Sequence, residues 1–97
     1  MKTMDQIEDI LKSSKLSLFQ KYHLKEIGVF GSYLRNEQKN ESDLDVLVEY
    51  EQTPDFFSFV HLENELSDLI GIKVDLVMKS ALKPFIGKRI LEEVRYL

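Results

Sequence analysis

Residues 25–50 decide the fold, and they read KEIGVFGSYLRNEQKNESDLDVLVEY. The first part, residues 25–30, carries β-branched and aromatic side chains and stops at Gly31, which predicts a short strand. Residues 32–42 are polar and show no apolar periodicity, so they predict a short helical turn followed by a loop. Residues 43–50 alternate between two faces, which predicts a second strand with one buried face: Leu44, Val46, Val48 and Tyr50 lie on one face, and Asp43, Asp45, Leu47 and Glu49 on the other.

Two carboxylates interrupt this second strand. Strands are depleted in Asp, yet Asp43 and Asp45 both lie in the best strand pattern of the chain. The two-residue period places both on one side, with side-chain roots about 7 Å apart, a spacing at which they can share a divalent cation. Asp75 interrupts the otherwise mostly apolar run 72–78, a third predicted strand. If that strand pairs beside the second, three carboxylates share one sheet face, and a cation is their natural compensation.

The turn after the first strand carries groups suited to a phosphate. Gly31 lets the backbone approach a ligand closely, and Ser32 offers both its N–H and its hydroxyl. Arg35 lies one helical turn further on and could reach the same anion, and Ser42 directly precedes Asp43. From the residues alone, plainer interpretations stay open: acids on a solvent face, an ordinary turn, a surface arginine and a loop serine.

The remaining segments predict helices. Residues 3–6, Thr-Met-Asp-Gln, have the form of a capping box, and Ser13-Ser14 are expected to break that helix or to start a second one. The next helix is expected to have Pro54 in its first turn and to stop at Gly71. Pro84 is expected to open the last helix, along which apolar residues align as far as Leu97. The expected order is α-α-β-turn-β-α-β-α, an α/β (α+β) fold with a small mixed sheet flanked by helices. The sheet face expected to be buried carries Leu44, Val46 and Val48, with Ile27 or Val29, and the carboxylate face is expected to stay open.

Composition narrows the classes of function. The 97 residues are expected to form one domain, 1–97, with 43% hydrophobic and 31% charged residues. The absence of cysteine excludes disulfides, a thiol nucleophile and cysteine-based metal sites. A net charge of −4 argues against a general nucleic-acid binder. No apolar run approaches the ~20 residues of a membrane span, and residues 1–6 lack the apolar stretch of a signal peptide. We therefore expect a cytoplasmic protein.

Taken together, the motifs have a characteristic spacing. An apolar-Gly-Ser turn, ten residues (33–42), Asp-apolar-Asp-apolar and a later strand Asp follow one another. This pattern resembles the nucleotidyltransferase superfamily of DNA polymerase β type. Residues 25–97 in particular are similar to the minimal nucleotidyltransferases (MNT, MntA-like) of prokaryotes. Many relatives have Gly where this chain has Asn36, but Asn tolerates left-handed backbone angles, so we expect the turn to survive.

The resemblance implies a role for each motif. Asp43, Asp45 and Asp75 would hold two Mg²⁺ ions, and Asp75 would also help deprotonate the attacking hydroxyl. The residues Gly31, Ser32, Arg35 and Ser42 would bind the nucleotide, ATP. Transfer of a nucleotidyl group needs no side-chain nucleophile. His23 and His61 lie outside the motif and are expected to be structural, at a helix end and on a helix face.

The resemblance also implies a biological role. The motifs, helices and strands occupy the chain, so the acceptor is expected to be small or presented by another protein. Minimal nucleotidyltransferases act as antitoxins of HEPN-domain toxins, and the implied reaction transfers AMP from ATP to a tyrosine hydroxyl of the toxin. Two alternatives stay open. One is an antitoxin that neutralises by binding alone, and the other is a nucleotidyltransferase for a small molecule such as an aminoglycoside, its pocket formed across a homo-oligomer.

Overall fold

A four-stranded mixed sheet forms the centre of the computed structural model, which describes residues 2–97. Its strands are β1 (Leu24–Phe30), β2 (Leu44–Tyr50), β3 (Val74–Met78) and β4 (Arg95–Tyr96). They lie in the order β3-β2-β1-β4. β2 runs antiparallel to β1 and parallel to β3, and β4 pairs antiparallel with β1. The predicted α/β (α+β) class with a small mixed sheet is confirmed.

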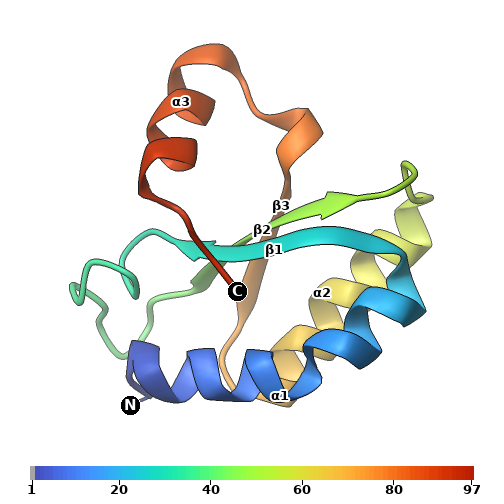
Figure 1. Ribbon diagram of the computed structural model, residues 1–97. Coiled ribbons are helices and arrows are strands. Elements are labelled where there is room, and N and C mark those ends of the chain that lie inside the picture. Colours follow the sequence, from blue (N-terminus) through green and yellow to red (C-terminus); the bar gives the residue numbers. More distant parts are fainter. Residues whose placement is uncertain (1) are drawn as a thin grey trace.

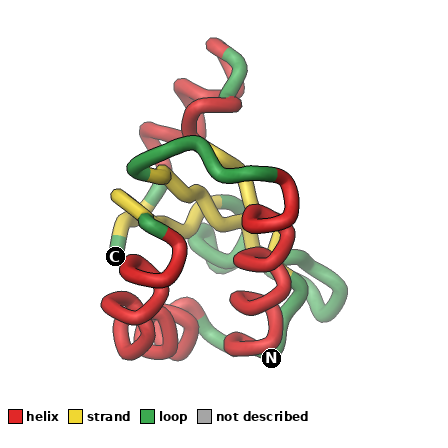
Figure 2. Tube along the Cα trace, turned by 90° about the vertical axis from the view of Figure 1, so that its right-hand side faces the viewer, coloured by secondary structure: helices red, strands yellow, loops and turns green. Residues whose placement is uncertain are grey.

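The helices lie on both sides of this sheet. α1 (Met4–Tyr22) and α2 (Phe56–Ile70) cover one face, and α3 (Pro84–Glu93) lies on the other side (Figure 1). A short 3-10 turn, η1 (Lys79–Ala81), leads from β3 toward α3. Seen from the side, the strands lie in the middle with helices around them (Figure 2). Within residues 2–97, none of the helices combines the length and the apolar character that crossing a membrane requires.

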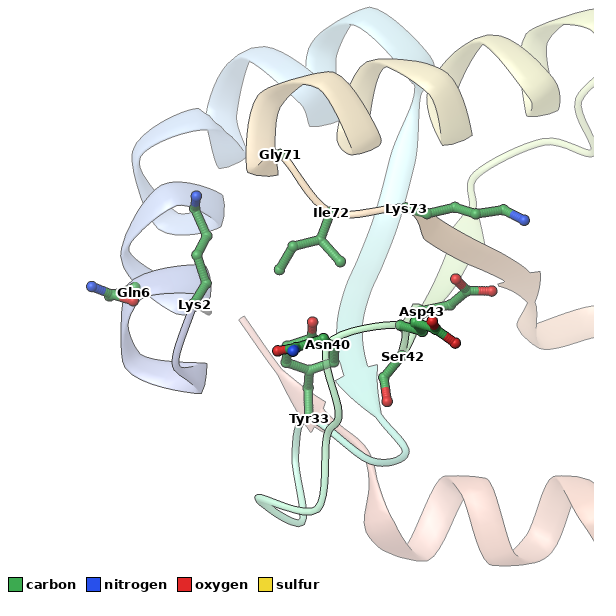
Figure 3. A pocket seen from close by; sticks show the side chains of 10 residues that line it. Lys2, Gln6, Tyr33, Asn40, Ser42, Asp43, Gly71, Ile72 and Lys73 are labelled. Carbon is green, nitrogen blue, oxygen red and sulfur yellow. The ribbon is translucent and has the colours of Figure 1, made fainter.

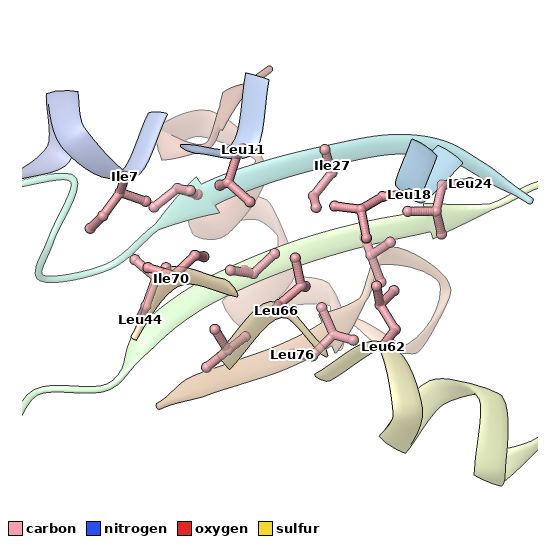
Figure 4. Close-up of a cluster of buried hydrophobic side chains, with 14 of the residues drawn as sticks. Ile7, Leu11, Leu18, Leu24, Ile27, Leu44, Leu62, Leu66, Ile70 and Leu76 are labelled. Atoms are coloured by element: carbon pink, nitrogen blue, oxygen red, sulfur yellow. The ribbon is translucent and has the colours of Figure 1, made fainter. Parts of the chain in front are cut away.

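The main core lies between the sheet and the layer of α1 and α2. Leu44, Val46 and Val48 are at most 1% exposed, and so are Ile27 and Val29, which confirms the predicted buried face. The helices contribute leucines and isoleucines at helical spacing: Ile7, Leu11 and Leu18 from α1, and Leu62, Leu66 and Ile70 from α2 (Figure 4). Each fully buried aliphatic side chain contributes about 1.5–3 kcal/mol. This packing holds β2 and its carboxylates in place.

The predicted break at Ser13-Ser14 is wrong, because α1 is one continuous helix of 19 residues. The Ser13 hydroxyl donates to the carbonyl oxygen of Asp9 at 2.9 Å, so it is satisfied inside the helix. Leu11 and Leu18, on either side of the serines, are both buried. Packing of this apolar stripe therefore outweighs the weak local preference of serine for a helix end.

The last helix also differs from the prediction, because α3 ends at Glu93 and does not continue to Leu97. The chain turns back, pairs as β4 with β1, and the Leu97 N–H donates to the carbonyl oxygen of Ile27 at 3.0 Å. The free edge of β1 offers unpaired backbone groups that attract a strand. Gly28 permits the close approach, since a Cβ there would lie 2.6 Å from Val94 Cγ2.

Two element starts shift by two residues. α2 begins at Phe56 and not at Pro54, because the Asp55 side chain caps it by accepting from the Ser58 N–H at 2.7 Å. β3 begins at Val74 and not at Ile72. The preceding helix stops as predicted at Gly71, which has φ +79°. The buried face of α2 carries Leu62, Leu66 and Ile70, whereas Phe56 and Leu69, which were expected on its apolar side, are exposed.

The carboxylate face is not as open as expected. Leu47 alternates with the buried valines of β2 and therefore points to this face, yet it is only 1% exposed. Its register partner Gly28 packs against Val94, in the segment that follows α3. α3 and this segment thus cover the middle of the face, and the carboxylates lie at its end.

The capping box at the start of α1 is confirmed and gives a stability prediction. Thr3 Oγ1 accepts from the Gln6 N–H at 3.3 Å, and Gln6 Oε1 accepts from the Thr3 N–H at 2.9 Å. We expect Thr3→Ala to lower the free energy of unfolding by about 1 kcal/mol and the melting temperature by roughly 4–8 °C. Thermal unfolding followed by circular dichroism measures this. Ser17→Ala, at an exposed position within the same helix, is expected to be neutral or slightly stabilising. Equal melting temperatures for Thr3→Ala and the unchanged chain would contradict the role of the cap.

Candidate active site

The three predicted carboxylates meet at one end of the sheet. Asp45 lies in β2 and Asp75 in β3, and the two are direct register partners in the parallel pair. Neighbouring strands are about 4.8 Å apart, and register partners point to the same face. Asp43 comes two residues before Asp45, just ahead of β2. The expected pairing of the third strand beside the second is confirmed, and it places the acids on adjacent strands.

The environment of Asp45 raises its pKa from 3.8 to about 6. Burial is the largest cause, because it disfavours the charged carboxylate, and repulsion from Asp75 and then Asp43 adds to it. Arg35 acts in the opposite direction, and Glu93 again raises the pKa. Asp43 and Asp75 are exposed, whereas Asp45 is half-buried. The cluster therefore carries an electrostatic strain that a bound cation would relieve.

Gly31 directly follows β1 and lies against Asp45. Its φ is +81°, in the left-handed region that favours glycine, and a Cβ there would overlap Oδ2 of Asp45 and lie 2.9 Å from its Cγ. Phe30, the preceding residue, is the register partner of Asp45 on β1. The site thus crosses three neighbouring strands in the order Gly31, Asp45, Asp75.

The turn that follows Gly31 has the predicted shape. Residues 32–36 form a turn in which the Arg35 N–H donates to the Gly31 carbonyl at 3.1 Å. The Glu37 N–H then donates to the Ser32 carbonyl at 2.8 Å. Asn36 adopts φ +58°, so the expectation that Asn tolerates this position is confirmed. Ser32 directly follows Gly31, the residue that lies against Asp45, and its contact with a phosphate stays a prediction.

Arg35 is held by two acids. Its Nε lies 3.0 Å from Glu37 Oε1, and its Nη1 lies 2.5 Å from Glu93 Oε1 at the end of α3. The guanidinium is close enough to Asp45 to lower the pKa of that carboxyl. Sequence analysis predicted Arg35 near the site but missed Glu93. Nothing in the sequence pattern marks Glu93, because its role comes from a contact between distant segments.

Ser42 closes the loop that leads into Asp43. Its hydroxyl accepts from the Lys39 N–H at 2.8 Å, and its own N–H donates to the Lys39 carbonyl at 3.0 Å. These two bonds fix the direction in which the chain enters β2. Contact between Ser42 and a nucleotide stays a prediction.

A hollow of about 730 Å³ opens beside Asp43 (Figure 3). Of the predicted site residues it is lined by Asp43 and Ser42, together with Lys2 from the start of the chain and Lys73 from the segment before β3. Lys2 extends toward Gly71, whereas Lys73 lies on the same side of the hollow as Asp43 (Figure 3). This hollow thus lies at one border of the carboxylate cluster and not over its centre.

The cluster is not a closed metal cage. Within residues 2–97, no three His, Asp or Glu side chains converge tightly enough to enclose an ion by themselves. Mg²⁺, however, typically takes one or two carboxylates and completes its shell with water and substrate phosphate. Three carboxylates that repel one another, two of them exposed, fit an open site of that kind better than a closed one.

The two histidines lie in the helix layer on the opposite sheet face. His23 caps the end of α1 with φ +56°. His61 lies on α2 and packs edge-on against Tyr22, with ring centroids 6.5 Å apart. Their predicted places, at a helix end and on a helix face, are confirmed.

Comparison with known proteins identifies the family. The sequence model of the nucleotidyltransferase domain family matches residues 4–97 of this chain. A Methanocaldococcus jannaschii protein, MJ0128, provisionally named a protein adenylyltransferase, is 54% identical over the full length of both chains. The protein adenylyltransferase MntA of Thermococcus cleftensis is 48% identical over all of this chain and 98% of its own.

Solved structures of similar fold support this family assignment. One provisionally described as a minimal nucleotidyltransferase has a TM-score of 0.77 at 31% identity, covering 94% of this chain and 95% of its own. An MNT antitoxin in complex with a tri-AMPylated HEPN toxin of Shewanella oneidensis shares the fold, with a TM-score of 0.67 at 20% identity, over 91% of this chain and 69% of its own. The resemblance that the Gly-Ser turn and the Asp-Leu-Asp strand indicate is thereby confirmed. The chain belongs to the nucleotidyltransferase domain family, alongside its minimal, MntA-like members.

Proposed function

We propose that this protein is an adenylyltransferase antitoxin, which transfers AMP from ATP to a tyrosine hydroxyl of a HEPN-family toxin. The observation that carries the proposal is that Gly31, directly after β1, lies against Asp45 of β2, which in turn is the register partner of Asp75 on β3, in a nucleotidyltransferase chain. The close relative MntA, itself named a protein adenylyltransferase, supports a protein acceptor. The MNT antitoxin of the same fold, in complex with an AMPylated HEPN toxin, supports the class of partner.

Asp43, Asp45 and Asp75 are the residues that would hold Mg²⁺, and their donor set fits this ion, as the mutual repulsion of the carboxylates indicates. Bound there, Mg²⁺ would neutralise charge on the phosphates and orient them. Gly31 and Ser32 offer backbone and hydroxyl groups to the triphosphate, since no side chain at Gly31 blocks the approach. Arg35 can add a cation once a phosphate competes with its two glutamates.

The transfer itself is an in-line displacement at phosphorus. The tyrosine oxygen forms a bond to the α-phosphorus of ATP, the bond to the diphosphate breaks, and diphosphate leaves. The tyrosine proton passes to the carboxylate of Asp75, which lies on the outer strand where an acceptor from a second protein has access. The chain thus acts chiefly by positioning and by charge, and it needs no covalent intermediate.

Intact-mass spectrometry of the partner tests the proposal. The HEPN protein that copurifies with the tagged chain is incubated with the chain, ATP and Mg²⁺, and in parallel with the Asp43→Asn/Asp45→Asn variant. We expect the partner to gain whole AMP units only with the unchanged chain, and we expect EDTA to prevent the gain. Fragmentation of the product then identifies the modified residue.

Two outcomes would contradict the proposal in different ways. If both versions bind the partner and silence it without any gain of mass, the protein neutralises by binding alone. If the mass gain is the same with both versions, the Asp43 and Asp45 carboxylates do not carry the reaction.

A further inference from the structure

The outer edge of β3 is held by side chains of α2. β3 is an edge strand, so alternate N–H groups along it point away from the sheet and have no strand to bind. Two of these are satisfied from the helix: the Val74 N–H donates to Ser67 Oγ, and the Leu76 N–H donates to Glu63 Oε2, both at 2.9 Å. The helix therefore takes the place of a neighbouring strand.

These two bonds lie on either side of Asp75. Val74 precedes it and Leu76 follows it, so the backbone is fixed at both flanks of the carboxylate. The inner side of β3 is fixed by its pairing with β2, where Asp75 is opposite Asp45. A strand held from both sides cannot slide or tilt, and the position of Asp75 relative to Asp45 is set accordingly.

The two side chains that anchor β3, Glu63 and Ser67, are themselves held in place. Ser67 Oγ also donates to the Glu63 carbonyl at 2.9 Å, which orients its lone pairs toward β3. Both side chains are half-buried, whereas Asn64 and Asp68, their neighbours on the helix, are exposed. α2 is fixed to the core by Leu62, Leu66 and Ile70. A carboxylate acceptor makes the stronger kind of hydrogen bond to an N–H group.

We propose that Glu63 and Ser67 are positioning residues for Asp75. They keep its carboxylate opposite Asp45, in the place that proton acceptance from the attacking hydroxyl requires, and this role rests on the function proposed above. The other groups that would contact the triphosphate or its Mg²⁺ lie outside β3 and keep their places: Gly31, Ser32, Asp43 and Asp45. Loss of the anchors should therefore slow the transfer step and leave the apparent affinity for ATP nearly unchanged.

Steady-state AMP transfer to the HEPN partner tests this with four variants. We expect Glu63→Ala and Ser67→Ala to lower kcat on the order of 10-fold, as loss of a supporting residue at a metal or catalytic site typically does, while KM for ATP changes less than about twofold. Glu63→Gln keeps an oxygen that can accept from Leu76 and is expected to restore most of kcat. Asn64→Ala, next to Glu63 on the exposed side, is the matched control and is expected to behave like the unchanged chain.

Amide hydrogen exchange gives a readout that does not depend on activity. We expect the Leu76 amide to exchange on the order of 10-fold faster in Glu63→Ala, and the Val74 amide in Ser67→Ala, because each loses one hydrogen bond. Wild-type kcat in both folded alanine variants, or equal exchange rates with and without the anchors, would overturn the inference. If the unchanged chain transfers no AMP while the exchange rates respond as expected, the anchoring holds and the proposed function is what fails.

Discussion

Replacing Asp45 by Asn is expected to lower AMP transfer on the order of 10²–10³-fold and, at the same time, to stabilise the fold at neutral pH. The loss of activity follows from removing one preorganised charge at the centre of the carboxylate cluster, which typically has an effect of this size. The gain in stability follows from burial and from the repulsion by Asp75 and Asp43, which raise the pKa of Asp45 to about 6. Asn has nearly the same shape but no charge to bury.

The sign of the pH dependence follows from the raised pKa. In the folded chain Asp45 holds its proton up to about pH 6, whereas in the unfolded chain the pKa is near 3.8. Between these values the folded state binds more protons, so this residue makes the folded state less stable as pH rises from about 4 to about 6. The loss then stays constant at higher pH. The Asp45→Asn variant lacks this dependence, so it and the unchanged chain should differ little near pH 4 and most above pH 6.

Urea unfolding between pH 4 and pH 8 measures the difference. Because Asp45 is partly solvated, we expect about 1–2 kcal/mol in favour of Asp45→Asn at pH 7. Glu51→Gln removes an exposed acid from the loop after β2 and serves as the control, with no expected change in transfer or in the shape of the pH curve. A variant less stable than the unchanged chain at pH 7 would show that the Asp45 carboxylate is favourably paired in the fold.

Local patterns predicted those parts of the structure that short segments decide. Alternation over residues 43–50 predicts β2 and its buried face, because a strand buries every second residue. The capping box depends on two residues three positions apart, and the stop at Gly71 and the left-handed Asn36 depend on the backbone preferences of single residues. The Gly-Ser and Asp-Leu-Asp motifs could likewise be placed near each other from the sequence, because each lies at the end of a strand that the local pattern predicts.

Contacts between distant segments could not be predicted in this way. The pairing of β4 with β1 depends on room above Gly28, which no pattern in residues 84–97 reveals. Ser13-Ser14 remain helical because buried leucines on either side outweigh a weak local preference. Glu93 and Glu63 look like ordinary helix-surface acids in the sequence, and only the fold brings them to Arg35 and to the edge of β3. For such residues a single sequence holds no signal.

Gly31→Ala is the second variant for which we expect a large effect, this time the loss of both stability and activity. The left-handed φ of +81° disfavours Ala by about 1–2 kcal/mol. In addition, the new methyl group would overlap the carboxylate of Asp45, so that carboxylate or the turn must move. A displaced Asp45 no longer faces Asp75 correctly, and misplacement by about 1 Å can lower a rate on the order of 10²-fold.

Gly71→Ala separates the two causes, because Gly71 has nearly the same φ, +79°, but among residues 2–97 its Cβ would meet only Lys2 Nζ, at an ordinary 3.5 Å. We expect Gly71→Ala to lose about 1–2 kcal/mol of unfolding free energy from the backbone alone and to keep its transfer activity. The additional loss of unfolding free energy in Gly31→Ala, compared with Gly71→Ala, measures the overlap of the new methyl group with Asp45. An Asp45→Ala background removes the overlapping Oδ2 and Cγ atoms and leaves only the tight 3.2 Å contact with Asp45 Cβ, so Gly31→Ala should cost clearly less there than in the unchanged chain. An undiminished cost in that background would mean that the strain lies elsewhere in the turn, and that Gly31 is required for its backbone conformation and not for its contact with Asp45.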